Sequence, residues 1–286
     1  MNTAREFLLQ SQNADGGWGY RVGAMSFVEP TAAALIALRD ENTFTLSEVE
    51  GRARDFLIAH QHADGGWGIA PMDAESGWMT AWAIRALAHS GGANDAIARG
   101  AQWLLATQVL RVEESANRAQ IKQLLAIDST LRGFPWQPGD ASWVQPTALA
   151  ILALVAAGQR DHARVREGIE YLFDRASARG GWNVGNPWMI GKAMPVTIQD
   201  TALALSALRS VQIAASDARV IAALAFVRAA SARVTTAAEL TWTLVALRDW
   251  QLEIEDVRAR LNALQRADGS WQGNPFITAI AMSSEM

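Results

Sequence analysis

Apolar and polar positions alternate along the chain in a pattern that recurs. An amphipathic segment at 3–12 leads into a Gly-Gly-Trp turn at 16–18, and an alanine-rich, almost wholly apolar segment at 31–38 follows. The same order returns 49 residues later, with its turn at 65–67. Glycine ends the first segment because it adopts backbone conformations that other residues avoid. A period of this size predicts stacked helical hairpins, each with an outer amphipathic helix and an inner apolar one.

Six such hairpins can be followed through the chain. The predicted outer helices are 3–12, 49–61, 95–108, 163–176, 217–231 and 254–266, and the inner helices start near 30, 78, 145, 199, 238 and 276. The third hairpin carries an insert near 109–132, in which helical spacing predicts an extra amphipathic helix. An open solenoid would leave one face of the apolar inner helices exposed. We therefore expect residues 1–286 to close into a ring as a single domain.

Composition excludes several classes of function. Half of the residues are hydrophobic and 19% are charged, yet no apolar run reaches the length of a membrane span. We expect a soluble chain with no transmembrane segment, and a peripheral membrane contact remains open. The N-terminus lacks the order of a secretory signal, which predicts a cytoplasmic protein. With no cysteine and four scattered histidines, structural zinc is not expected. A net charge of −4 without basic runs argues against nucleic acid as a partner.

The turns carry a family resemblance. The first two hairpins share one spacing: an aromatic residue, Leu, three residues, Gln, three residues, Gly, any residue and Trp. The fourth and sixth hairpins carry weaker copies. This spacing resembles the QW repeat of squalene-hopene and oxidosqualene cyclases, which belong with class II diterpene cyclases and protein prenyltransferase β-subunits in the α/α-toroid group. The resemblance implies an all-α fold, an (α/α)6 barrel, whose inner helices enclose an apolar cavity for an isoprenoid.

The residues that make up the turns are expected to be structural. The glutamines are predicted to tie helix ends, and the tryptophans to brace the outside of the barrel. They are Gln12, Gln61, Gln108 and Gln265, and Trp18, Trp67, Trp182 and Trp271.

The resemblance also locates the position where chemistry would begin. In class II cyclases the acid that protonates the substrate lies in a D-x-D-D motif followed by Thr-Ala at the start of an inner helix. The best match here is Thr197-Ile198-Gln199-Asp200-Thr201-Ala202. Gln199 stands where the family has its proton donor, and an amide cannot supply a proton to an alkene. Asp200 remains, and we expect it to cap the helix by accepting the amides of Ala202 or Leu203, with a lowered pKa.

Other acids are alternative proton donors. Sites just ahead of the inner-helix threonines hold Glu29 and Glu239, and in a closed barrel these would share one mouth with Asp200. Asp73 and Glu75 form a second acidic candidate, in the loop before the second inner helix. The alternative is that Asp73 and Glu75 are solvent-exposed charges with no functional role.

Several side chains could bind a substrate beside these acids. Aromatic faces stabilise carbocations, although core packing is the commoner role for a single tryptophan. The candidate substrate-binding residues are Trp78, Trp82, Trp143, Trp188, Trp242 and Gln199. Parallel helix starts would also attract an anion such as a diphosphate, with Arg132 or Lys192 as possible helpers. No cofactor is expected, except magnesium if the substrate is a diphosphate.

Two functions from different classes remain open. One is a single-domain terpene cyclase-like enzyme that acts on an isoprenoid with a displaced acid. The other is a module that keeps the apolar pocket but only binds an isoprenoid, a lipid or a partner peptide. A prenyltransferase β-subunit is set aside because zinc there needs a cysteine, and an (α/α)6 glycosidase explains the turns poorly.

Overall fold

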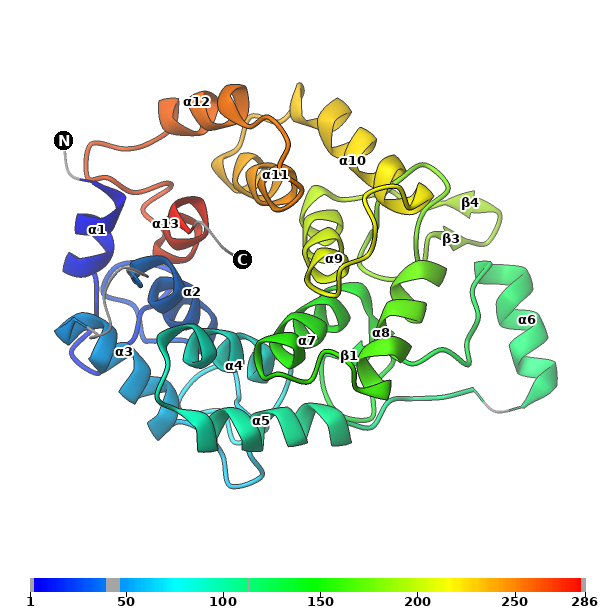
Figure 1. The fold of residues 1–286 in the computed structure, drawn as a ribbon, viewed down its shortest axis with the longest axis horizontal. Helices are drawn as coiled ribbons and strands as arrows, with labels where there is room; N and C mark the ends of the chain where they lie inside the picture. Colours follow the sequence, from blue (N-terminus) through cyan, green and yellow to red (C-terminus); the bar gives the residue numbers. More distant parts are fainter. Residues whose placement is uncertain (1–2, 40–46, 113, 284–286) are drawn as a thin grey trace. The chain divides into compact units, whose positions relative to one another are not determined.

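The computed structural model describes residues 3–39, 47–112 and 114–283. These residues form thirteen helices and two short β-hairpins, and they divide into two compact units. Unit 1 comprises residues 1–106 and 258–286, and unit 2 comprises residues 107–257. Figure 1 shows the helices of each unit, coloured along the chain.

Unit 1 is built on three inner helices. Helix α2 packs between α4 and α13, and nearly all of its residues are buried because the sequence is apolar on every face. Helices α1, α3 and α5 pack on the outside of this layer. The helices of unit 1 are α1 (Ala4–Gln10), α2 (Val28–Leu38), α3 (Glu48–Ala59), α4 (Met79–Ser90), α5 (Asn94–Ala106) and α13 (Pro275–Met282).

Unit 2 repeats this arrangement. Helix α9 packs between α7 and α11, while α8 and α10 cover them from outside. The helices are α6 (Ser115–Leu125), α7 (Val144–Ala156), α8 (Ala163–Asp174), α9 (Ile198–Ser210), α10 (Ala218–Ser231) and α11 (Ala237–Asp249). The boundary between the units falls inside α12 (Glu255–Ala263). Two antiparallel hairpins complete the unit: β1 (Phe134–Pro135) with β2 (Ser142–Trp143), and β3 (Trp188–Met189) with β4 (Lys192–Ala193).

The turn tryptophans join each outer helix to its inner helix. The indole N–H of Trp18 donates to the Leu8 carbonyl at 3.0 Å, and its backbone N–H donates to Thr31 Oγ1 at 2.9 Å. The same pair of bonds links Trp67 to Leu57 and Thr80, Trp182 to Leu172 and Thr201, and Trp271 to Leu261 and Thr278. All four indoles are buried. These contacts agree with the predicted structural role, which the Trp67→Ala variant would test.

The glutamines connect neighbouring hairpins. Gln12 Nε2 donates to the carbonyl of Gly16 in its own turn at 2.8 Å and to that of Val49 in α3 at 2.9 Å. Gln61 makes the equivalent bonds to the carbonyls of Gly65 and Ala96, and Gln265 bonds the Gly269 carbonyl. The turn and the next outer helix are therefore held by one side-chain amide.

The predicted helices are confirmed to within a few residues, because the turns and the apolar runs mark their ends. A helix, α6, lies inside the predicted insert, with no buried residue of its own. No helix in the described part of the chain is long and apolar enough to cross a membrane. The single-domain organisation stays a prediction.

Candidate functional site

Glu29 occupies a repeat position of particular interest. It is the second residue of α2, two residues before Thr31, whose hydroxyl accepts the Trp18 amide. Gln199 is the second residue of α9, two residues before Thr201, whose hydroxyl accepts the Trp182 amide. Glu29 is thus the counterpart in unit 1 of Gln199 in unit 2, with a carboxyl in place of the amide.

The Glu29 carboxyl is buried against hydrogen-bond donors. Only 8% of the residue is exposed, and the Tyr20 hydroxyl donates a short hydrogen bond to Glu29 Oε2. Burial raises the pKa of Glu29 to about 7, against the lowering effect of the Tyr20 hydroxyl and of the nearby Trp82 indole. Trp82 Nε1 makes no hydrogen bond of good geometry within the described residues. Below neutral pH the carboxyl therefore carries a proton.

A cluster of aromatic rings adjoins this acid through Tyr20 and Trp82. The ring of Tyr20 lies 5.1 Å from that of Phe27 and 6.0 Å from that of Phe276, and the Trp82 ring lies 5.8 Å from Phe276. The guanidinium of Arg85 lies over the Trp82 ring, 5.1 Å from its centroid. Aromatic faces carry a negative quadrupole and can stabilise a cation. A neutral acid and several aromatic faces thus meet at the start of α2.

Three predicted residues of unit 2 line one pocket. Gln199 and Glu239 at the starts of α9 and α11, and the buried Trp242, border a pocket of about 600 Å³. Arg233, which precedes α11, lines it as well. The turn from α10 to α11, residues 232–236, contains neither glycine nor tryptophan. The pocket opens beside that turn.

Asp200 differs from expectation. Its Oδ2 accepts the Thr197 hydroxyl at 2.6 Å, and its amide donates to Thr197 Oγ1 at 3.2 Å. Thr197 is therefore the cap, and no described bond links the Asp200 carboxyl to the amides of Ala202 or Leu203. Burial raises the pKa of Asp200, so the predicted lowering is wrong. The side chain is only 7% exposed, and desolvation outweighs the hydroxyl donor.

Glu239 repeats the arrangement of Asp200 on the next inner helix. The Thr236 hydroxyl donates to Glu239 Oε2 at 2.7 Å, and the Glu239 amide donates back to Thr236 Oγ1 at 3.3 Å. Unlike Asp200, this carboxylate is exposed. It is suited to stabilising the start of α11 and to contacting a ligand in the pocket.

In the acidic loop of unit 1, which holds Asp73 and Glu75, the Asp73 carboxyl bonds backbone amides of the same loop. Asp73 accepts the amide of Ile69 at 2.9 Å through Oδ2 and that of Glu75 at 3.2 Å through Oδ1. The Glu75 side chain is exposed. Both oxygens of the Asp73 carboxyl are thus bonded to backbone amides of its own loop. Among the described ranges, no three His, Asp or Glu side chains form a group that could hold a metal ion.

The remaining predicted residues lie in different places. Trp78 is a half-buried residue at the start of α4, and Trp143 pairs with Phe134 in the first β-hairpin of unit 2. Trp188 lies on the exposed β3 strand. Of the two suggested basic helpers, Arg132 pairs with Glu167 at 3.4 Å, and Lys192 lies exposed on β4.

Sequence reasoning missed Tyr20 and Phe276. Tyr20 follows a turn tryptophan by two residues, and Phe276 stands two residues before Thr278, which is the repeat position of Glu29. Comparing that one position in every hairpin would have drawn attention to Phe276.

Comparisons with known proteins agree with this fold. Residues 1–118 match the family model of the squalene-hopene cyclase C-terminal domain. A search of curated protein sequences gives no significant match. A variant of the type II terpene cyclase MstE from Scytonema, in complex with geranylgeranyl dihydroxybenzoate as substrate, aligns at a TM-score of 0.66 and 18% identity. The alignment covers 98% of this chain and 94% of that one.

Two further structures are similar. A complex of MstE with its product, merosterolic acid A, has a TM-score of 0.63 and 19% identity over 98% of this chain and 93% of that chain. A protein from Actinoplanes has a TM-score of 0.57 and 20% identity, over 94% of this chain and 80% of that chain. These likenesses confirm the predicted fold class. The chain therefore has the all-α, α/α-toroid fold of the type II terpene cyclases, and its first 118 residues are similar to the squalene-hopene cyclase C-terminal domain.

Proposed function

We propose that this protein cyclises an isoprenoid by protonating one of its double bonds, with Glu29 as the acid. The observation that carries the proposal is the buried Glu29 carboxyl, which accepts the Tyr20 hydroxyl beside a cluster of aromatic rings, at the repeat position of the missing family acid. Burial raises the pKa of Glu29 to about 7, which favours the protonated form that a general acid needs. Similarity of fold to MstE, whose complexes hold a geranylgeranyl substrate and its product, supports the substrate class.

The chemistry follows from the groups around Glu29. The π electrons of an alkene take the carboxyl proton, which leaves a carboxylate on Glu29 and a carbocation on the substrate. The Tyr20 hydroxyl, already donating to Oε2, stabilises that carboxylate. The next alkene of the substrate attacks the cation and closes a ring, and loss of a proton to a base ends the sequence. Tyr20 and Phe276 offer aromatic rings to the cationic intermediates.

Tyr20 is well placed to keep this role. Burial raises the pKa of its hydroxyl far above the ordinary value, and the Glu29 carboxylate adds to the effect. The phenol thus stays protonated and remains a donor over the working range of pH.

A non-catalytic binding module is the second candidate. The pocket beside Gln199 and Trp242 favours it, because that pocket places an amide where the resemblance implies an acid. Such a module would hold an isoprenoid or lipid without turning it over.

The test compares the wild type with Glu29→Gln, Tyr20→Phe, Asp200→Asn and the exposed-loop control Glu75→Gln. Each purified protein is incubated with geranylgeranyl dihydroxybenzoate, squalene and geranylgeranyl diphosphate, and products are analysed by mass spectrometry. We expect Glu29→Gln to abolish cyclised product, because an amide N–H is far too weakly acidic to protonate an alkene. We expect Tyr20→Phe to slow the reaction roughly 10-fold or more, by removing a donor to the carboxylate, and Glu75→Gln to retain full activity.

Three results would count against Glu29 as the acid. Turnover in Glu29→Gln at the wild-type rate excludes its role. Loss of product in Asp200→Asn with Glu29→Gln active assigns the acid to Asp200 instead. If the wild type binds a substrate but neither it nor any variant forms a product, the binding module is favoured. Circular dichroism of every variant separates these results from unfolding.

A further inference from the structure

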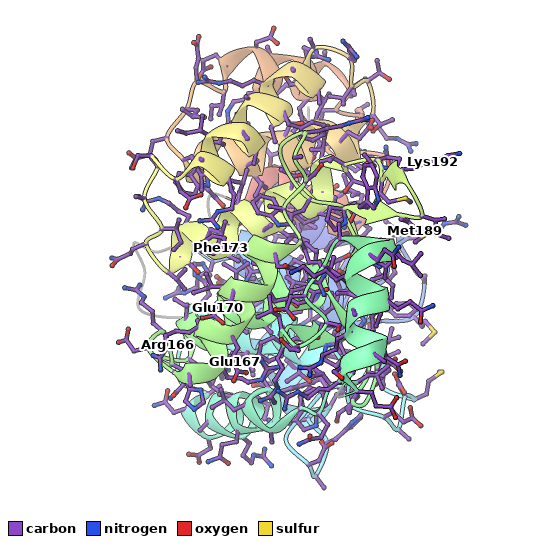
Figure 2. All side chains as sticks on the ribbon, turned by 90° about the vertical axis from the view of Figure 1, so that its right-hand side faces the viewer. Arg166, Glu167, Glu170, Phe173, Met189 and Lys192 are labelled. Atoms are coloured by element: carbon purple, nitrogen blue, oxygen red, sulfur yellow. The ribbon has the colours of Figure 1, made fainter. Side chains whose placement is uncertain are left out.

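One exposed apolar surface of unit 2 lies outside the pocket that Gln199 and Trp242 line. It comprises Trp188, Met189 and Ile190 of the β3–β4 hairpin together with Leu124 of α6, and we call it the hairpin tip. Ile190 is 73% exposed, and the other three are each more than a third exposed. The Ile190 amide donates to the Leu124 carbonyl at 2.9 Å, which holds the hairpin against α6. Figure 2 looks onto this face, with Met189 and Lys192 on the hairpin near α6.

The backbone at the tip is unusual for the residue that it carries. Ile190 has φ 44° and Gly191 has φ 79°, which is the left-handed pair of a two-residue hairpin turn. Asn, Asp or Gly normally occupies the first of these positions, and a β-branched residue there is strained. Strain retained at a surface position points to a function for the side chain. Isoleucine thus stands where Asn, Asp or Gly would suit the backbone better.

Exposed positive charges lie on both elements that form the tip. The chain contains two lysines, and both lie here, Lys122 on α6 and Lys192 on β4. Arg118 adds a third exposed cation, and neither 115–127 nor 183–199 contains an acidic residue. Glu114 and Asp128 flank α6 at its ends. On a chain of net charge −4, this is a local basic surface.

We propose that the hairpin tip inserts into the interfacial layer of an anionic lipid bilayer, with Lys192 and Lys122 on the lipid headgroups. Tryptophan favours the boundary between headgroups and acyl chains, and the apolar Met189 and Ile190 can enter it. Lysines at the edge of an inserted apolar group attract anionic lipids. A peptide or a second copy of this chain would need a complementary apolar and acidic face, and the bilayer supplies both at once. This inference does not depend on Glu29 or on any catalytic activity.

The test is co-sedimentation of the full chain with vesicles, without substrate. One set of vesicles is pure phosphatidylcholine, and the other contains one part in three phosphatidylglycerol. We expect binding to the mixed vesicles that weakens as salt is raised, because salt screens the lysines. Ile190→Asn should lower the partition coefficient about 10-fold through loss of apolar burial. It should leave thermal stability unchanged or higher, since asparagine suits the turn.

Two further variants separate the charges from the apolar contacts. Lys192→Gln should cost about 5-fold on mixed vesicles and nothing on neutral ones. Ile221→Asn, an equally apolar exposed position on α10, serves as the matched control and should bind like the wild type. A wild type that stays in solution with both kinds of vesicle overturns the proposal. So does equal loss in Ile190→Asn and Ile221→Asn, or a dimer that depends on Ile190 and forms without vesicle binding.

Discussion

Replacing Glu29 by glutamine should change how the stability of the protein depends on pH. The pKa of Glu29 is about 7 in the folded state, against an ordinary value of 4.5. The folded chain therefore binds this proton more tightly than the unfolded chain does. Its contribution to the free energy of unfolding is fully present below pH 4.5 and is lost as the pH rises through 7. At about 1.4 kcal/mol per pKa unit, roughly 2.5 kcal/mol of this loss falls between pH 5 and pH 8.

Urea denaturation of the wild type and Glu29→Gln across that pH range measures the effect. The wild type should lose about 2.5 kcal/mol more stability than the variant between the two ends, because glutamine does not titrate. Asp200, whose pKa is also raised, is present in both proteins and cancels in the difference. A stability difference that stays constant from pH 5 to pH 8 would refute the burial of a protonated acid, and the proposed proton donor with it.

Two predictions concern the turns. Trp67→Ala should destabilise the chain by about 3–5 kcal/mol, since it removes a fully buried indole, and thermal unfolding would show it; an unchanged melting temperature would show that the turn is not structural. Gly65→Ala should cost more stability than Gly23→Ala in the same assay. Both glycines have positive φ, but only at Gly65 would the new Cβ lie 2.8 Å from the Arg99 carbonyl oxygen, while Gly23 has open space. Equal losses would contradict this steric reason.

The sequence predicts the helices well because residues close to each helix end determine where it begins and ends. A Gly-Gly-Trp turn, the threonine that accepts its amide and an apolar run are all features of a few neighbouring residues, as at Trp67 and Thr80. The third hairpin shows how robust the pattern is. Phe134 replaces the tryptophan there, yet its amide still donates to Thr147 Oγ1 at 2.8 Å.

The candidate site is less predictable because its electrostatics depend on residues far apart in the sequence. Glu29 could be named from the sequence, but its protonation depends on burial, and the ring of Phe276 comes from the other end of the chain. Asp200 shows the same limit, since the balance between desolvation and a hydroxyl donor sets the direction of its pKa shift. The conformation of the β3–β4 turn is likewise invisible to periodicity, because Ile190 is an improbable residue for it.

The glutamines at the ends of α1 and α3 have a consequence for how the chain opens. Gln12 and Gln61 each hold a carbonyl of the next outer helix, so a hairpin that loses its fold releases a bond on its neighbour. The folding of one hairpin therefore stabilises the next hairpin, as in a row of coupled repeats. The passage from α10 to α11, whose sequence has no such turn, interrupts that row. Amide protons there should exchange with solvent by local opening before those of the tied hairpins.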